Sequence, residues 1–194
     1  MVKTIIGVTG TKAAGKNEFV KIPEEEHGFI SFSLADIVRE EAKRRGLPSS
    51  TPNLQNIGDE LRRTHGNAVL AERVVRRISK LPEGSRIVIN SIRNPAEVRF
   101  LQEEFGEEFF LIGIDADLNI RRERYLQREG VRKEDFDRDR KRDLGEVESY
   151  GQQVGKCLEM AQRIIDNSST LEELREKTRE PLYRIGIRRE KEFA

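Results

Sequence analysis

The stretch Ile5–Phe19 reads I-I-G-V-T-G-T-K-A-A-G-K-N-E-F. Its apolar beginning, residues 4–9, predicts a short buried strand. The strand runs directly into the segment 10–16, which matches G-x-x-x-x-G-K, the pattern of a loop that wraps around phosphate. Because a strand precedes this loop and a helix follows it, phosphate binding explains the pattern better than an accidental glycine-rich turn does.

The chemistry of phosphate binding explains the spacing. Glycines let the backbone bend so that successive N–H groups point at one anion, and the following helix adds its positive N-terminal end. Lys16 places a charge at the β- and γ-phosphates. Asn17 stands where a Ser or Thr normally ligates Mg²⁺, so its amide oxygen is a weaker candidate metal ligand. The predicted nucleotide-binding residues of the loop are Gly10, Thr11, Lys12, Ala13, Ala14, Gly15, Lys16 and Asn17.

Length and composition restrict the class of protein. A chain of 194 residues suits one domain with a small insert. Lys and Arg number 36 against 35 Asp and Glu, so the net charge of +1 gives no general attraction to nucleic acid or membranes. A single cysteine, Cys157, excludes an internal disulfide and a cysteine-based zinc site. No apolar run approaches ~20 residues, and we expect a cytoplasmic protein without a membrane partner.

Strand and helix patterns alternate along the rest of the chain, which predicts a parallel sheet covered by helices on both faces. Pro23 is expected to end the first helix. The predicted helix caps are Ser33, Asn53, Asn94 with Pro95 behind it, and either Ser168 or Ser169. Further strands are expected at 28–32, 86–90, 109–114 and 163–166, and the main helices at 33–41, 54–63, 68–80, 118–128, 146–163 and 171–177.

Charged residues follow two of the predicted strands at the edge where ligands bind in parallel sheets. Asp36 and Arg39 lie three residues apart on one helix face after the second strand, and a surface ion pair explains them equally well. Arg93 follows the third strand, where a phosphate would lie. These three residues are therefore candidates for contacting a ligand at this edge of the sheet.

The most charged segment, residues 129–142, interleaves cations and anions. It is either a solvated helix with ion pairs or a mobile lid that brings arginines over nucleotide phosphates, and its position favours a lid at about 129–145. Nucleic-acid binding through its arginines is a weaker alternative, because the interleaved acids oppose it. We therefore expect no nucleic-acid partner.

Several motifs resemble the P-loop nucleoside and nucleotide kinase family over nearly the whole chain. G-V-T-G-T-K-A-A-G-K resembles dephospho-coenzyme A kinases and the kinase-like domain fused to deoxycytidylate deaminases. The C-terminal I-D-N-S-S and L-E-E-L are similar to dephospho-coenzyme A kinases. L-Q-N-I-G-D-E-L-R-R-T-H-G, S-I-R-N-P-A-E-V and Y-G-Q-Q-V-G-K-C look more like the deaminase-fused domains and archaeal adenylate-kinase-related proteins. The His-x-Glu and Pro-Cys-x-x-Cys motifs of the deaminase itself are absent, which excludes that activity.

The resemblance implies a three-layer α/β sandwich with a five-stranded parallel sheet and a helical lid. A single domain would cover residues 1–180, followed by a charged tail at 181–194. The implied catalytic residues are Lys16, Asp36 and Arg93, and the implied acceptor-binding residues are Asp36, Arg39, Arg62 and Arg93. Arg124, Arg128, Arg138 and Asn167 would contact the nucleotide.

The function that follows is transfer of a phosphoryl group from ATP, with Mg²⁺, to a nucleoside monophosphate or to dephospho-coenzyme A. The alternative is a nucleotide-binding sensor or regulator with weak turnover or none. Two departures from the family pattern keep this alternative open. Asn17 replaces a Ser or Thr, and Asn90 replaces the Asp that usually follows the third strand, and both changes weaken metal binding.

Overall fold

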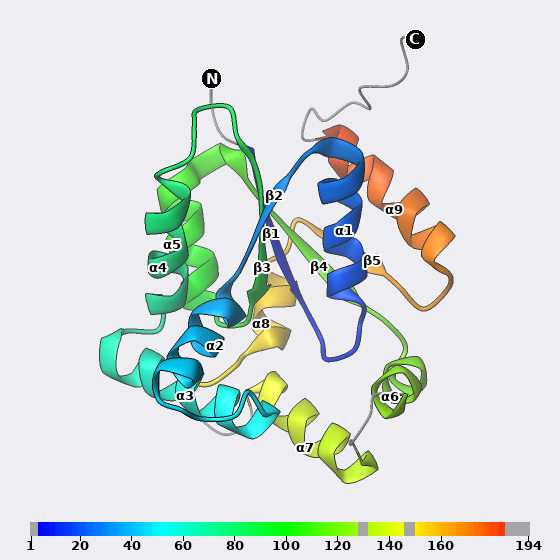
Figure 1. The fold of residues 1–194 in the computed structure, drawn as a ribbon. Coiled ribbons are helices and arrows are strands. Elements are labelled where there is room, and N and C mark those ends of the chain that lie inside the picture. The colour runs from blue at the N-terminus through cyan, green and yellow to red at the C-terminus, as the bar shows by residue number, and fades with distance from the viewer. Residues whose placement is uncertain (1–3, 128–131, 146–149, 185–194) are drawn as a thin grey trace.

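The fold is built on a five-stranded parallel sheet with the strand order β2-β3-β1-β4-β5 (Figure 1). The computed structural model describes residues 4–127, 132–145 and 150–184. The strands are β1 (Thr4–Gly10), β2 (Ile30–Ser33), β3 (Arg86–Ile92), β4 (Phe109–Asp115) and β5 (Arg163–Asp166). The predicted fold class is confirmed.

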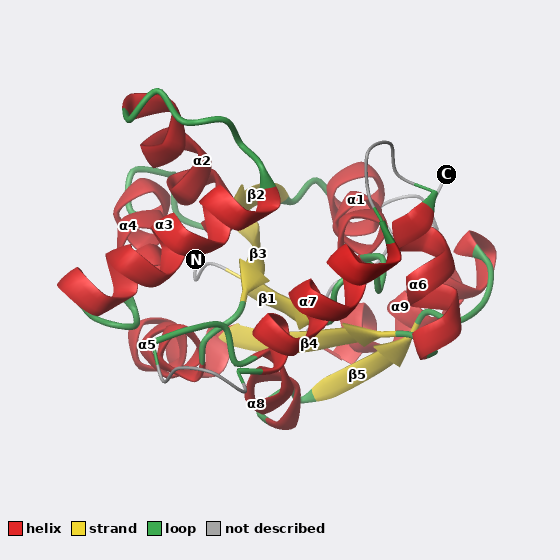
Figure 2. Ribbon diagram, turned by 90° about the horizontal axis from the view of Figure 1, so that it is seen from below, coloured by secondary structure: helices red, strands yellow, loops and turns green. Residues whose placement is uncertain are grey.

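Helices form the outer two layers (Figure 1). One face is covered by α1 (Lys16–His27) and α9 (Leu171–Arg184), and the other by α2 (Leu34–Arg44), α4 (Val69–Ile78), α5 (Pro95–Phe105) and α8 (Val154–Glu159). A 3₁₀ turn at Gly106–Glu108 leads into β4. Near the carboxyl ends of the strands lie α3 (Thr51–His65), α6 (Leu118–Leu126) and α7 (Lys133–Leu144), with α7 crossing between α3 and α6 (Figure 2).

The core follows from the two-residue period of the strands. Ile5 and Ile87 are fully buried against the layer that contains α4 and α5. Their neighbours Ile6 and Val88 are fully buried against the layer that contains α1 and α9. Successive strand residues point to opposite faces, so a continuous apolar run fills both layers at once.

Pro23 does not end the first helix, which continues to His27. The ring of Pro23 is buried with Ile22 in the layer that α1 covers, and this packing keeps the helix intact despite the missing N–H group. The helix ends at Gly28, which has a φ of 65° and donates its N–H to the Pro23 carbonyl. The expected stop at Pro23 therefore lies four residues before the last helical residue, His27.

Two predicted caps are replaced and a third makes no capping bond. Asn53 lies inside α3, which opens with Thr51 and Pro52, and its side chain donates to the Pro48 carbonyl at 3.0 Å. Ser33 occupies the N-cap position of α2 as predicted, but its hydroxyl donates to Ser91 and makes no hydrogen bond to the helix. At α9, the hydroxyl of Thr170 accepts the N–H of Glu173 at 3.2 Å, and neither Ser168 nor Ser169 does so. The predicted cap at Asn94 is confirmed, with Pro95 in the first turn of α5.

The long helix predicted for residues 146–163 is wrong where the structure describes it. Only Val154–Glu159 forms a helix, since the backbone before it is held by the turn after β3. The carbonyl of Gly151 accepts the side chain of Asn94 at 2.9 Å, and the N–H of Gln153 donates to the Arg93 carbonyl at 2.7 Å. Residues 146–149 lie outside the described residues.

The C-terminal boundary also moves. α9 extends to Arg184, and the side chain of Leu182 is only 2% exposed in the layer formed with α1. Residues 181–184 thus belong to the folded unit and not to a tail, and the expected tail from 185 onward lies outside the described residues. No helix among the described residues is long and apolar enough to cross a membrane.

Candidate functional site

The loop between β1 and α1 has the backbone geometry that its glycines predict. A Cβ on Gly10 would lie 2.0 Å from the carbonyl oxygen of Ile114, so only glycine fits between β1 and β4 there. Gly15 has a φ of 94°, and a Cβ there would lie 2.1 Å from the Asn167 amide nitrogen. Ala13 has a φ of 61°, a conformation that costs energy for any residue other than glycine. The loop is therefore strained and closely packed at the sheet edge.

Lys16 and Asn167 tie the loop together. The ammonium of Lys16 donates to the carbonyls of Gly10 and Thr11, each at 2.8 Å. Asn167, at the end of β5, is 6% exposed and donates its side-chain amide to the Ala14 carbonyl at 2.8 Å. Asn167, which is predicted to lie beside a nucleotide base, therefore also forms a hydrogen bond directly to the loop.

A cavity of about 520 Å³ joins the loop to the residues that the resemblance assigns to an acceptor, and we call that part of the cavity its acceptor end. At the loop end its lining includes Lys12, Ala13, Gly15, Lys16, Asn17, Arg124 and Asn167. At the other end it includes Leu34, Val38, Arg39, Leu54, Gln55, Gly58, Arg62, Leu70 and Arg93. One continuous space therefore contacts cations from both groups of predicted site residues.

The acceptor-side pair Asp36 and Arg39 forms an ion pair on α2 with both side chains about half exposed. Arg39 lines the cavity, whereas Asp36 is not among the described residues that do so. Arg124 also lines the cavity, and its guanidinium donates to the Asn167 carbonyl at 2.8 Å and to the Ser169 carbonyl at 3.3 Å. Asp36, proposed from the resemblance as a catalytic residue, therefore lies beside the cavity rather than in its lining.

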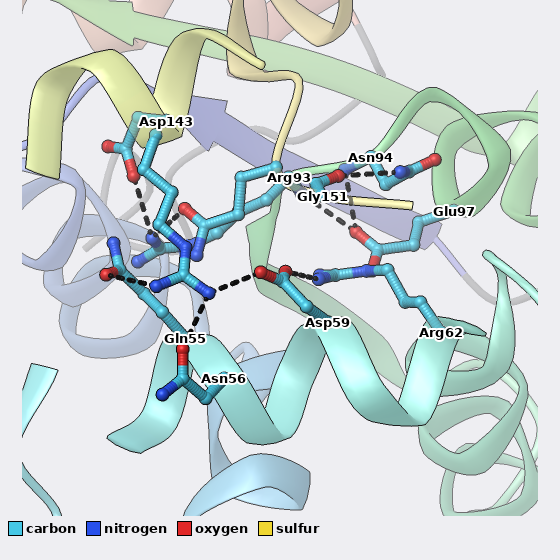
Figure 3. A network of polar contacts seen from close by, with 11 residues as sticks. Gln55, Asn56, Asp59, Arg62, Arg93, Asn94, Glu97, Asp143 and Gly151 are labelled. Carbon is cyan, nitrogen blue, oxygen red and sulfur yellow. Dashed lines mark hydrogen bonds and ion pairs between the residues drawn. The ribbon is translucent and has the colours of Figure 1, made fainter. Parts of the chain in front are cut away.

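Arg62 is buried in an ion pair. Its guanidinium donates through Nε and Nη2 to Glu97 Oε1 at 3.0 and 2.9 Å, and both side chains are almost completely buried (Figure 3). The other oxygen of Glu97 accepts the backbone N–H groups of Arg93 and Asn94 at 2.8 and 3.0 Å. Arg62 thus contacts the cavity while it fixes α3 to the turn after β3, a structural role that the sequence did not indicate.

Arg93 projects from this turn toward α7 (Figure 3). Its guanidinium donates to Gln152 Oε1 at 2.8 Å and lies 3.4 Å from a carboxylate oxygen of Asp143. The neighbouring Arg142 of α7 pairs with Asp59 on α3. The β3 turn, α3 and α7 are therefore joined around the acceptor end of the cavity.

The loop end has its own contact with α7. Lys12 Nζ lies 2.8 Å from Asp139 Oδ2, and the hydroxyl of Tyr125 donates to the same oxygen at 3.0 Å. Arg138, a predicted nucleotide contact, pairs with Asp135 and Asp139, and its side chain is 54% exposed. Arg128, another predicted nucleotide contact, lies outside the described residues.

The two amides that depart from the family pattern face each other. Asn90 Nδ2 lies 3.3 Å from Asn17 Oδ1, so their side chains are within hydrogen-bond distance near the end of β3, beside the loop. Thr11 donates its hydroxyl to Asp115 Oδ1 at 2.6 Å, and the same carboxylate lies 3.7 Å from Arg121. Asn17 and Asn90 would offer Mg²⁺ neutral oxygens only, so these residues fit a bound nucleotide better than a tightly held metal.

Sequence reasoning missed several residues of the site. Asp139 and Asp143 lie four apart on α7 and are 0% and 3% exposed, yet in the sequence they are two acids among many in a charged segment. Ser91, with a φ of 64°, lines the cavity and carries no sequence signal of its strain. Glu97 had one usable signal, since it stands three residues after Asn94 in the spacing of a capping box.

Comparison with solved structures identifies the fold. The chain is similar to a shikimate kinase from Bacteroides thetaiotaomicron, with 12% identity, a TM-score of 0.55 and coverage of 95% of this chain and 99% of that one. A gluconokinase from Sinorhizobium meliloti has a TM-score of 0.53 at 15% identity, covering 94% and 93% of the two chains. A dephospho-CoA kinase from Campylobacter jejuni has 0.51 at 17%, covering 95% and 98%. The chain therefore has the fold of P-loop kinases.

Comparison with curated sequences identifies the family, although no family model matches the chain. A UPF0200 protein of Methanosarcina barkeri is 35% identical over 173 residues, covering 87% of this chain and 88% of that protein. One from Thermoplasma acidophilum is 32% identical, covering 92% and 94%. A UPF0200/UPF0201 protein of Archaeoglobus fulgidus is 33% identical over 94% of this chain, which spans only 56% of that longer relative. The chain belongs to the UPF0200 protein family.

Proposed function

We propose that this protein binds ATP at residues 10–17 and transfers the terminal phosphoryl group to a small nucleotide-like acceptor. The acceptor would be a nucleoside monophosphate or dephospho-coenzyme A, held at the end of the cavity formed by α2, α3 and the turn after β3. The observation that carries this proposal is the single cavity that Lys16, Arg39, Arg93 and Arg124 all line. A transferase needs its donor and acceptor in one enclosed space, whereas a storage site for one nucleotide does not.

In the proposed reaction, an oxygen of the acceptor attacks the γ-phosphorus of ATP. The bond from that phosphorus to the β,γ-bridging oxygen breaks, and ADP leaves. When the attacking oxygen is a hydroxyl, its proton would pass to the transferred phosphoryl group or to solvent. Lys16 would turn from the Gly10 and Thr11 carbonyls toward the β- and γ-phosphates, while Arg93 would contact the transferring group or the acceptor phosphate. Catalysis would come mainly from positioning and from neutralising phosphate charge.

Mg²⁺ would reduce the negative charge on the phosphates of ATP when it is bound. Asn17 could contribute an amide oxygen, and the nucleotide itself would supply most of the ligands. Because Asn17 and Asn90 carry no charge, we expect the protein itself to bind Mg²⁺ more weakly than it would with a carboxylate at position 90.

A panel of acceptors tests the proposal. The protein is incubated with ATP, Mg²⁺ and AMP, a deoxynucleoside monophosphate or dephospho-coenzyme A, and ADP release is followed. We expect release with one acceptor class, and a decrease of roughly 10²-fold or more in Lys16→Ala, because the cation at the phosphates is lost. Lys21→Ala is the matched control, since Lys21 is exposed and pairs with Glu18 on the same helix. Confirmed ATP binding without ADP release from any acceptor would contradict phosphoryl transfer.

The contact between Asn17 and Asn90 favours a second candidate function, a nucleotide sensor that turns over slowly or not at all. This function predicts tight ATP binding and negligible ADP release in the unmodified protein. Asn90→Asp would then introduce a carboxylate beside the phosphates and raise Mg²⁺-dependent turnover. Turnover in the unmodified protein that Asn90→Asp does not increase would argue against a sensor.

A further inference from the structure

One helix reaches both ends of the candidate site with acidic side chains. Asp139 and Asp143 lie four residues apart on α7, so they project from the same face of the helix. Asp139 meets Lys12 of the phosphate loop, and Asp143 meets Arg93 at the acceptor end. Both cations also line the cavity.

Asp139 is an unusual carboxylate for a helix rich in exposed charges. It is 0% exposed, and its Oδ2 receives hydrogen bonds from Lys12 at 2.8 Å and from Tyr125 at 3.0 Å, while Arg138 approaches Oδ1 at 3.3 Å. Tyr125 stacks at a tilt on Phe136 with ring centroids 5.3 Å apart. Burial and the neighbouring Asp139 raise the pKa of Tyr125 to about 12, so its phenol remains a hydrogen-bond donor at neutral pH. A buried carboxylate with these donors is a specific counter-ion of Lys12.

Asp143 has a looser version of the same arrangement. Its side chain is 4% exposed and lies 3.4 Å from Arg93 Nη1, which also donates to Gln152 at 2.8 Å. Arg142, one residue before it, pairs with Asp59 and contacts Asn56 at 3.0 Å on α3 (Figure 3). α7 is thereby attached to the phosphate loop, to the turn after β3 and to α3.

Carboxylates and phosphates bind the same cations through charge-assisted hydrogen bonds, so they compete for them. Lys12 and Arg93 face the cavity, and each already has an acidic partner on α7. A nucleotide phosphate that binds either cation competes with this carboxylate for its positive charge, and where it displaces the carboxylate the energy of the existing pair is subtracted from its affinity.

We propose that Asp139 and Asp143 act as internal counter-ions which occupy the phosphate-binding cations Lys12 and Arg93, and that substrate phosphates bind by displacing them. Regulation of the site is thus built into α7. The inference rests on the proposed function only in that the loop must bind a polyphosphate, and it does not require that transfer occurs.

The test compares the affinity for ATP and for inorganic tripolyphosphate by calorimetry, without an acceptor. Asp139→Asn is expected to bind both about tenfold more tightly, because loss of the competing charge is worth about 1.4 kcal/mol per tenfold change. Asp143→Asn is expected to bind ATP roughly threefold more tightly, since its pair is longer and Arg93 retains Gln152. Asp137→Asn is the matched control on α7, because it removes the same charge from a side chain that is 48% exposed and pairs with Arg122. Its affinity should stay the same.

A second measurement uses the unmodified protein. The chain has three tyrosines, nine phenylalanines and no tryptophan, so the tyrosine band of its near-ultraviolet circular dichroism reports on Tyr125 and two other tyrosines only. Tripolyphosphate does not absorb there, and its binding should change the Tyr125 signal as Asp139 leaves the phenol. Tyr125→Phe, which lacks this signal, identifies the change.

Equal or weaker binding by Asp139→Asn would overturn the proposal, because Asp139 would then support phosphate binding rather than oppose it. Tripolyphosphate binding to the unmodified protein without any change in the Tyr125 signal would overturn it as well. If neither the unmodified protein nor Asp139→Asn binds polyphosphate, the proposal fails together with nucleotide binding. Binding without ADP release from any acceptor contradicts only the proposed transfer reaction.

Discussion

In the loop at residues 10–17, contacts with neighbouring residues limit which side chains fit at single positions more than the G-x-x-x-x-G-K pattern does. Gly15 has a left-handed backbone and faces Asn167 from the end of β5. Ala13 and Ser91 are the two non-glycine residues with positive φ among the described residues, and both line the cavity. Strain of this kind persists only where the surrounding structure fixes the conformation, and it gathers at functional sites.

Gly15→Ala is expected to lower the free energy of unfolding by about 3 kcal/mol, because the new Cβ combines backbone strain with a clash. The Cβ would lie 2.1 Å from Asn167 Nδ2, whose side chain is held by the Ala14 carbonyl. Urea unfolding followed by circular dichroism measures the change.

Gly28→Ala is the control for this experiment. Gly28 has a φ of 65°, and a Cβ added there would meet nothing within 4 Å beyond its chain neighbours. Its substitution therefore carries backbone strain alone, about 1 kcal/mol. Equal losses in the two variants would show that Asn167 gives way and that the close packing on Gly15 is unimportant.

At the scale of elements, one helix start joins distant parts of the site. Asn94 caps α5 by accepting the N–H of Ala96 at 2.9 Å, and Glu97 completes the capping box. The same Asn94 donates to the Gly151 carbonyl at 2.9 Å, which fixes the segment before α8. The residues that start α5 therefore also hold Arg93, Arg62 and the chain that follows α7.

Asn94→Ala is expected to cost about 2–3 kcal/mol, more than an ordinary cap, because it removes a cap and leaves a buried carbonyl without its donor. Asp117→Ala is the matched comparison. Asp117 caps α6 through bonds to the N–H groups of Asn119 and Ile120 in an exposed setting, and its loss should cost about 1 kcal/mol. Thermal unfolding of both variants gives the difference, and an equal cost would mean that the bond to Gly151 contributes nothing.

At the scale of the whole molecule, Cys157 reports on the integrity of the core. Its side chain is buried, with 0% exposure, in the layer formed by α2, α4, α5 and α8. Burial raises its pKa from 9.0 to about 12, with a smaller effect from Glu97. A neutral thiol in this position is inert, so its reaction with a thiol reagent requires the domain to open.

Because the pKa of Cys157 is higher in the folded protein than in the unfolded chain, the free energy of unfolding decreases as the pH rises. The contribution of the neutral thiol to stability is complete below pH about 9 and is lost as the pH rises toward about 12, because the unfolded chain releases the proton first. We therefore expect the free energy of unfolding to decline between pH 9 and pH 10 by up to about 1 kcal/mol more than in Cys157→Ala. Urea titrations at both pH values measure this slope, and identical slopes would contradict a buried thiol.

The sequence alone determined the layered fold and the strand–loop–helix that contains residues 10–17. Mostly apolar strands of the length of Arg86–Ile92, separated by helices, can bury both faces only in a parallel sheet that helices cover on both sides. The pattern from Gly10 to Lys16 is local, so its glycine and lysine spacing can be recognised without the rest of the fold. Some helix ends could not be predicted from the sequence. The structures at Pro23 and in the segment 150–153 depend on packing against distant residues, and local helix propensity gives no information about such packing.

Only the tertiary structure decided which charged side chains form ion pairs with each other. The resemblance implied Arg62 as a substrate contact, and the structure shows that this residue, which lines the cavity, is also paired with Glu97. In the sequence Asp139 is one acid among many in a charged segment, and the fold buries it against Lys12. Neither pair can be read from sequence spacing, because each joins residues far apart in the chain. Burial makes such pairs specific, and burial is decided by the fold as a whole.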